Sequence, residues 1–145
     1  MQVVQFEIRI KAKKEAVWKT LWEDKSFRDW SSNIDEGTYM LGELLEGNEV
    51  QFLSSVNGYG VTSLVEKLEE YDYVKFIHGA DTQDSGNALR DKEWTGGTET
   101  YSLKEENGVT TLTLTTDVPD EMIDLFNERI PKALDRIKVL SELIA

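Results

Sequence analysis

The 145-residue sequence contains no cysteine, only two prolines and a single histidine, and these shortages exclude several kinds of chemistry. A chain without cysteine forms no disulfide, binds no zinc through thiolates and has no cysteine nucleophile. One histidine among scattered carboxylates also gives no recognisable metal-ligand motif. We therefore expect no metal and no cofactor, and the lack of cysteine fits the reducing cytoplasm, where we place the protein.

Long apolar runs and an excess of positive charge are missing as well. No hydrophobic stretch approaches membrane-spanning length, and the first residues alternate between apolar and polar instead of resembling a secretion signal. The 28 acidic residues outnumber the 16 basic ones, and the net charge of −12 repels phosphate backbones and anionic lipid surfaces. We expect an intracellular protein with no nucleic-acid partner and no membrane insertion, whose charge serves mainly solubility.

The composition that remains is that of a folded globular protein, with 39% hydrophobic and 30% charged residues. Its length suits one domain, over residues 1–145, built around a single core. No stretch of linker composition divides the chain.

The strongest local signal is the Asn107-Gly108 pair, which lies between two runs of alternating residues. Both residues of such a two-residue turn take positive φ, so a β-hairpin is expected over residues 97–116. The turn fixes the register and places these pairs on one face: Leu103 with Leu112, Tyr101 with Leu114, and Glu99 with Thr116. Because this face is otherwise apolar, the carboxylate of Glu99 is predicted to point into the core.

Alternating residues predict the other strands. A first strand with one buried face is made by Val4, Phe6, Ile8 and Ile10. Six more are expected near Gly37–Leu41, Glu49–Val56, Val61–Glu69, Tyr73–Gly79, Gly97–Glu106 and Val109–Thr116. The buried side of the second and third of these six stays open between two possible core pairs, Phe52 with Val65 or Leu53 with Leu64.

The strand near Tyr73–Gly79 is easier to orient. Lys75 marks its outer face, so the core should receive Val74, Phe76 and His78. The polar segment Ala80–Thr95 that follows is expected to be a long loop, a candidate rim or lid.

Apolar residues at three- and four-residue spacing predict helices in the remaining segments. Two short ones are expected at Lys14–Trp22 and Asp24–Trp30, with Asp24 capping the second. A long one runs from about Pro119 to Ala145 and opens with Asp117 as its cap. Its inner stripe is Ile123, Phe126, Ile130, Ala133 or Leu134, Ile137, Leu140 and Ile144. Pro131 interrupts this helix and is expected to bend it around a curved sheet.

These elements predict an α+β fold. A curved antiparallel sheet of six to seven strands carries two short helices after its first strand, and a long C-terminal helix packs over the sheet with a cavity between them. An antiparallel barrel of the lipocalin type is the rival, but it would leave the apolar stripe of the terminal helix without a surface to bury against.

Several stretches resemble the START-like, or SRPBCC, superfamily, which has the Bet v-type helix-grip fold. They are IKAKKEAVWKTLW from Ile10, Trp30 at the end of the second short helix, KEWTGGTETYSL from Lys92, and PKALDRIKVL from Pro131. Within the superfamily they are most similar to the branch of Aha-type activators of a heat-shock chaperone ATPase. Fold does not fix function, because members include lipid carriers, cyclases, hydrolases and chaperone activators.

The resemblance implies an elongated, mostly apolar cavity between the sheet and the C-terminal helix, able to take a small hydrophobic or amphipathic molecule. The candidate wall residues are Trp30, Phe76, His78, Trp94, Glu99, Tyr101, Phe126 and Ile130. Trp and Tyr suit such walls because they combine area with a polar atom. Core packing is the better interpretation for Trp18 and Trp22, whereas Trp94 lies beside Gly96-Gly97 at the edge of the expected lid.

His78 and Glu99 are the candidates for catalysis. A meander places both at the strand ends joined by the long loop, where an imidazolium would favour ionisation of the carboxylate and the pair could do acid–base work. The simpler alternative is that Glu99 hydrogen-bonds Thr116 or a tyrosine while His78 is a satisfied structural residue. A Ser-His-Asp triad ranks lower, since no serine has a recognisable nucleophile turn.

The leading hypothesis is therefore an intracellular protein that carries or senses a small apolar or amphipathic ligand. An enzyme of cyclase, dehydratase or hydrolase type that uses His78 and Glu99 comes second. The third hypothesis is a module whose partner is a heat-shock chaperone, as the Aha-type resemblance implies.

Overall fold

The computed structural model describes residues 1–56, 58–83 and 95–144, with the backbone alone for residues 59 and 80–83. Its elements are β1 (Gln2–Ile10), α1 (Lys14–Trp22), α2 (Asp24–Ser31), β2 (Thr38–Leu41), β3 (Glu49–Ser54), β4 (Tyr59–Glu69), β5 (Tyr73–Gln83), β6 (Thr98–Glu106), β7 (Val109–Val118), a 3₁₀ turn η1 (Asp120–Met122) and α3 (Ile123–Ile144). The strands form one antiparallel sheet in the order β1-β7-β6-β5-β4-β3-β2.

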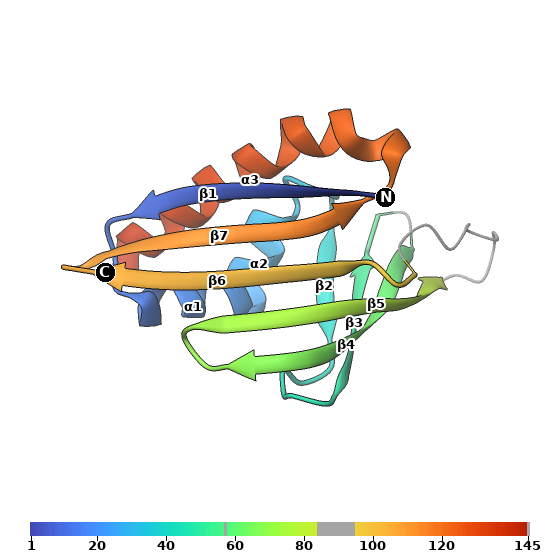
Figure 1. Ribbon diagram of the computed structural model, residues 1–145, viewed down its shortest axis with the longest axis horizontal. Coiled ribbons are helices and arrows are strands. Elements are labelled where there is room, and N and C mark those ends of the chain that lie inside the picture. The colour runs from blue at the N-terminus through green and yellow to red at the C-terminus, as the bar shows by residue number, and fades with distance from the viewer. Residues whose placement is uncertain (57, 84–94, 145) are drawn as a thin grey trace.

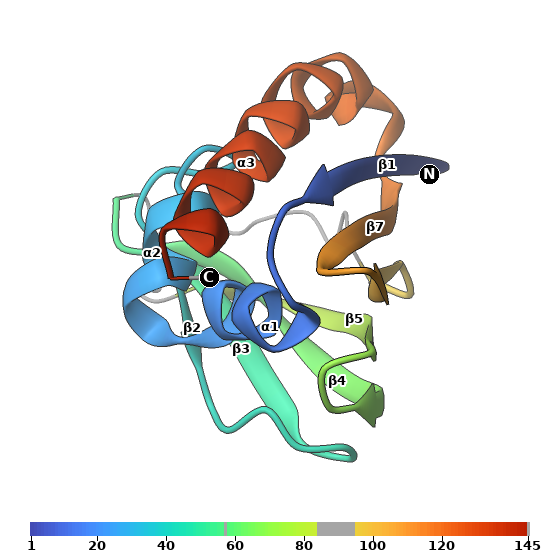
Figure 2. The ribbon, with the colours of Figure 1, turned by 90° about the vertical axis from the view of Figure 1, so that its left-hand side faces the viewer.

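The sheet and the helices form two layers. Figure 1 looks onto the outer face of the sheet, with the three helices behind it. The view turned by 90° shows the sheet curling around the helices, with α3 running over its open side (Figure 2). This is the predicted helix-grip α+β fold. The lipocalin-type alternative is wrong, because the sheet order leaves β1 and β2 as separate edges.

The hairpin has the predicted register. Asn107 and Gly108 have φ values of 53° and 78°, and Glu99 lies opposite Thr116, as Tyr101 lies opposite Leu114. Because neighbouring Cβ atoms on a strand point to opposite faces, this register alone puts Glu99 and Tyr101 on the helix side of the sheet.

The short helices match their predicted positions, but the predicted cap is wrong. The residue before α2 is Glu23, and no side chain caps the helix there. Asp24 lies inside the first turn, where its carboxylate accepts a hydrogen bond of 2.9 Å from Nε of Arg28. Asp24 therefore forms an i,i+4 ion pair with Arg28 and does not cap the helix.

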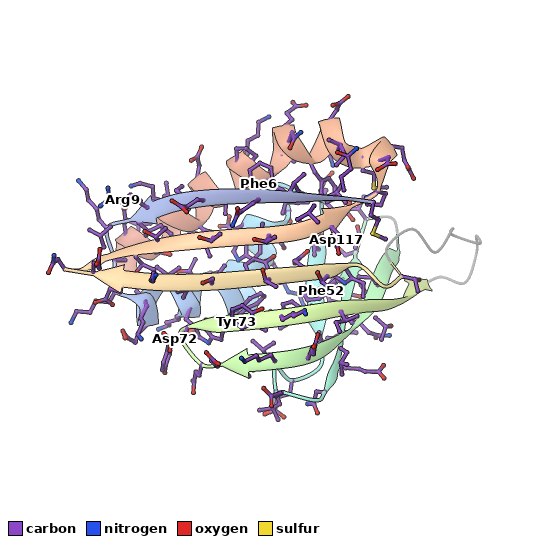
Figure 3. All side chains as sticks on the ribbon, viewed as in Figure 1. Phe6, Arg9, Phe52, Asp72, Tyr73 and Asp117 are labelled. Atoms are coloured by element: carbon purple, nitrogen blue, oxygen red, sulfur yellow. The ribbon has the colours of Figure 1, made fainter. Side chains whose placement is uncertain are left out.

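The C-terminal helix begins later than predicted, since α3 starts at Ile123 after the 3₁₀ turn. Asp117 is not its cap: the carboxylate accepts hydrogen bonds from the backbone N–H of Thr98, at 2.8 Å, and from its hydroxyl, so it joins the end of β7 to the start of β6 (Figure 3). Helical structure continues through Pro131, which is exposed. The predicted stripe fails at its last position, because Ile144 is 52% exposed whereas Ser141 is buried.

The open question on the third and fourth strands has a different answer for each strand. On β4 the buried residue is Val65, with Leu64 38% exposed, whereas on β3 it is Leu53, at 4% exposure, and Phe52 is only partly buried. Neither predicted pair forms, since Phe52 lies opposite Val61 and Leu53 opposite Gly60. These two strands approach closely: a Cβ on Gly60 would lie 1.9 Å from the carbonyl oxygen of Phe52. Only glycine fits that position without moving the backbone.

β5 is longer than predicted, since it runs to Gln83 and pairs there with β4. The first four residues of the expected loop, 80–83, are therefore strand. The remainder of that candidate lid, residues 84–94, lies outside the described residues. Of the helices in the described part of the chain, none combines the length and apolar character that crossing a bilayer requires.

Candidate functional site

A pocket of about 340 Å³ lies between the inner face of the sheet, α2 and the first half of α3. Its wall is made by Phe27, Trp30, Ser31, Ile34, Asp35, Thr38, Phe52, Leu53, Gly60, Val61, His78, Glu99, Tyr101, Leu114, Thr116, Met122, Leu125, Phe126, Arg129 and Ile130. Rings and aliphatic side chains dominate, with a polar corner formed by side chains of β5, β6 and β7 and a second polar group near the start of α3. A mostly apolar wall with a few placed polar groups is the usual character of a ligand pocket.

Most of the predicted site residues meet in this wall: Trp30, His78, Glu99, Tyr101, Phe126 and Ile130. Phe76 does not. It is completely buried and packs edge-on against Trp22 and Phe52, behind the pocket surface. Trp94, the remaining predicted site residue, lies outside the described residues.

The polar corner brings His78 and Glu99 together from neighbouring strands. Nε2 of His78 and Oε1 of Glu99 are 3.8 Å apart, in ion-pair range but beyond direct hydrogen-bond distance. On its other side, His78 makes a 2.7 Å hydrogen bond through Nδ1 to the hydroxyl of Ser63. The second carboxylate oxygen of Glu99, Oε2, accepts a 2.7 Å hydrogen bond from the hydroxyl of Tyr101.

Burial and these partners act in opposite directions on the Glu99 carboxyl. Burial alone raises its pKa, but the interaction with the nearby imidazole of His78, together with the hydroxyls of Tyr101 and Thr116, outweighs burial and holds the pKa below the usual 4.5. Burial raises the pKa of Tyr101 well above 10, and the neighbouring Glu99 charge raises it further. At neutral pH the corner therefore holds a carboxylate that only accepts hydrogen bonds and a phenol that donates one.

The carboxylate of Glu99 also determines which ring nitrogen of His78 carries the hydrogen in the neutral form. A lone pair on Nε2 would face the negative Oε1, so the favourable state carries the hydrogen on Nε2, and the Ser63 hydroxyl then donates to Nδ1. Ser63 can equally accept from a protonated ring, because a hydroxyl does both. It is 1% exposed and is not part of the pocket wall, so it positions the imidazole and is not placed to attack a ligand.

An aromatic cluster backs the pocket and fixes its inner surface. The ring of Trp22 lies 5.0 Å from that of Tyr101 in an edge-to-face arrangement and 6.1 Å from that of Phe27. Trp30 packs edge-on against Phe27 and donates its indole N–H to the carbonyl of Leu21 at 3.2 Å. Aromatic pairs of this kind add about 0.5–1.5 kcal/mol each beyond the burial of the rings, so they stabilise this wall of the pocket.

Arg129 forms the second polar group of the pocket. It lies one turn after Phe126 on α3, and its Nη1 donates a 2.7 Å hydrogen bond to the carbonyl of Ile34, in the connection between α2 and β2. The contact joins the roof of the pocket to its side wall. Within the described residues, no group of three or more His, Cys, Asp or Glu side chains is arranged to hold a metal.

Sequence reasoning missed Arg129, Ser63 and Phe52. Arg129 could have been found from helical spacing, because it is three residues after Phe126 and shares its face. Ser63 could not, since it reaches His78 through an irregular register in which Val61 opposes Asp81 while Ser63 opposes His78. Phe52 was left between two orientations because both faces of its strand carry apolar residues.

Comparison with known proteins rests on structure. No family model matches the chain, and no curated protein matches its sequence. Solved structures do. Protein MLL2253 from Mesorhizobium loti has a TM-score of 0.77 at 13% identity, with 99% of each chain covered. The Aha1 dimer from Colwellia psychrerythraea has a TM-score of 0.69 at 22% identity, with 97% of each chain covered. The AHSA1-like protein from Aeromonas hydrophila has a TM-score of 0.70 at 16% identity and covers 99% of this chain and 94% of its own.

These neighbours confirm the helix-grip fold that the sequence resemblance implied. Two of them carry the Aha1 or AHSA1 name of the branch to which the resemblance pointed. At these identities they establish the fold, and function must be argued from the site itself.

Proposed function

We propose that this protein binds a small hydrophobic or amphipathic molecule in the pocket beneath the first half of α3, as a carrier or sensor in the cytoplasm. The observation that carries the proposal is the pocket, with its volume of about 340 Å³, its walls mainly of rings and aliphatic side chains, and a few polar groups that include His78 and Glu99. This volume falls at the lower end of the range of roughly 300–1,000 Å³ for small-molecule sites. The absence of cysteine supports the cytoplasmic location.

Tryptophan fluorescence tests this proposal. Trp30 is part of the pocket wall, so medium-chain alcohols, medium-chain fatty acids and small non-fluorescent aromatic molecules should change its emission. Phe126→Glu places a carboxylate in the roof and should abolish the response while circular dichroism still reports the folded protein. Leu143→Glu is the matched control, because Leu143 is 76% exposed on the same helix and is not part of the pocket wall. The absence of any response across the panel would overturn the proposal.

The contact between His78 and Glu99 favours a second function, an enzyme of cyclase, dehydratase or hydrolase type. A carboxylate kept ionised beside an imidazole supplies an acid and a base in one pocket. In such an enzyme, His78→Ala and Glu99→Gln would each remove turnover while a bound substrate still perturbs Trp30. A variant that keeps full turnover would exclude this function.

The third candidate is a module that binds a heat-shock chaperone, which the Aha1 and AHSA1-like neighbours support. A pull-down with purified chaperone tests it. Capture that survives both His78→Ala and Glu99→Gln would favour this candidate over the enzyme, and absence of capture would exclude it.

A further inference from the structure

We propose that the pocket selects amphipathic acids, molecules with an apolar body and one carboxylate, and that Arg129 in its roof binds that carboxylate. This inference rests on the proposed ligand-binding function and specifies the chemistry of the ligand. Its starting point is a difference among the basic residues of α3, which are Arg129, Lys132, Arg136 and Lys138.

Three of these four cations have a carboxylate partner, and Arg129 does not. The ion pairs are Lys132 with Glu128, Arg136 with Asp29, and Lys138 with Glu142. Among the described residues no carboxylate lies within ion-pair distance of Arg129, although Asp35 belongs to the same pocket wall. In a chain with 28 acidic and 16 basic residues, Arg129 thus keeps its positive charge available on the wall of a pocket.

A hydrogen bond to the backbone holds the guanidinium in place. Arg129 is half-buried, and its Nη1 donates to the carbonyl of Ile34 at 2.7 Å. This bond uses one of the five N–H groups of the guanidinium, and the others have no hydrogen-bond partner within the described part of the chain. Because the side chain is already held by one contact, a ligand that binds it removes little further side-chain freedom.

A carboxylate matches the N–H groups that remain. The guanidinium is a planar fork whose N–H groups reach both oxygens of a carboxylate in two parallel, charge-assisted hydrogen bonds. A half-buried cation on a mainly apolar wall has also lost part of its hydration, and an anion compensates for that loss. A ligand hydroxyl would accept a hydrogen bond but leave the charge without a counterion, and a ligand ammonium would meet a like charge.

The acidic groups of the protein favour a ligand with one negative charge over a ligand with two. Glu99 lies in the sheet wall and Arg129 in the helical roof, and the Glu99 charge already has His78 beside it. A phosphate monoester, with nearly two charges, would be repelled more strongly by Glu99 and Asp35 than one carboxylate. The net charge of −12 acts on every anion, but salt screens exposed charges beyond about 8 Å, and direct contact with Arg129 is screened much less.

Four probes with the same alkyl chain separate these possibilities: octanoate, 1-octanol, octylammonium and octyl phosphate. Their dissociation constants for the full chain at pH 7 are measured by tryptophan fluorescence and by isothermal titration calorimetry. We expect octanoate to bind at least about tenfold more tightly than each of the others, the scale of one hydrogen bond to a charged group.

Arg129→Gln should reduce the preference for octanoate over 1-octanol to less than about threefold. Lys132→Gln is the matched control and should leave the preference intact, because Lys132 is on the same helix, is 65% exposed and is not part of the pocket wall. The two variants have the same net charge, so a general effect of charge would change both alike. The ranking of the four probes on the unmodified protein remains a test even where a variant fails to fold.

The outcomes are distinguishable. Equal binding of octanoate and 1-octanol would overturn the carboxylate inference and leave the ligand-binding proposal standing. An equal loss of preference in Arg129→Gln and Lys132→Gln would overturn the role of Arg129. Tightest binding of octyl phosphate or of octylammonium would overturn the choice of a carboxylate. If none of the four binds while small aromatic molecules do, this inference alone fails, and if neither group binds, both proposals fail.

Discussion

The two halves of α3 meet the rest of the molecule in different ways. The helix packs against α1 and β1, and its C-terminal half contributes Ile137 and Ser141, which are both fully buried. The N-terminal half lies over the pocket, where Phe126 is only partly buried. One continuous helix therefore serves as a packed core element at one end and as the roof of a binding space at the other.

This difference assigns stability and binding to separate parts of the same element. A well-packed interface resists any change in volume, whereas a side chain that borders an empty space can be shortened with little loss of contact. The packed half thus holds the helix in place, and the roof half remains free to be shaped for a ligand. The predictions below test this division, starting with the largest effect.

Shortening a side chain should lower the free energy of unfolding much more in the packed half of α3 than in the roof half. Ile137→Ala removes a fully buried side chain from the packed half and should lower the free energy of unfolding by about 2–5 kcal/mol. Phe126→Ala, in the roof, should cost less than half as much, although phenylalanine is the larger side chain. Urea denaturation followed by circular dichroism measures both, and equal losses would contradict the division of the helix.

A smaller change, of opposite sign, is expected at Ser141. Its hydroxyl is buried in the packed half and has no hydrogen-bond partner among the described residues. Ser141→Ala removes this unsatisfied group without creating a large cavity, and alanine is the better helix former. We expect a gain of about 1 kcal/mol in the free energy of unfolding, again from urea denaturation. A loss of stability would mean that the hydroxyl has a partner in solution, so the packing there is less dry than the structure indicates.

The sequence allowed the prediction of features that depend on neighbours along the chain. The turn at Asn107-Gly108 determines which residues face each other in the hairpin, and that register was enough to place Glu99 and Tyr101 on the helix side of the sheet. The short helices were equally accessible, because the spacing of Trp18, Leu21 and Trp22 is a local property.

Features that depend on distant partners were beyond the sequence. Asp117 has the local signature of a helix cap, but Thr98 on the neighbouring strand provides its hydrogen bonds. Phe76 and His78 share one face of β5, yet the aromatic cluster covers the first and the pocket wall includes the second. Phe76 and His78 are equivalent in the alternating pattern of the strand. Which of them borders the pocket depends on how far the helix layer extends along β5, and the alternation of residues does not determine that.

The smallest of the predicted stability effects concerns pH and the polar corner of the pocket that the roof half covers. The pKa of Glu99 is lower in the folded protein than the usual 4.5, so its ionisation stabilises the fold at pH values above 4.5, and this contribution is lost as the pH falls through the folded-state pKa. Because burial opposes the favourable partners, the net effect should be modest. Glu99→Gln removes the titrating group.

The difference in unfolding free energy between the original protein and Glu99→Gln should therefore be constant near neutral pH. It should shift against the original protein as the pH drops below about 4.5. Urea denaturation at pH 7, 5, 4 and 3 measures this difference, with Glu106→Gln as the exposed control on the same strand. Parallel curves for the original protein and Glu99→Gln would show that the carboxylate gains nothing from His78 and Tyr101.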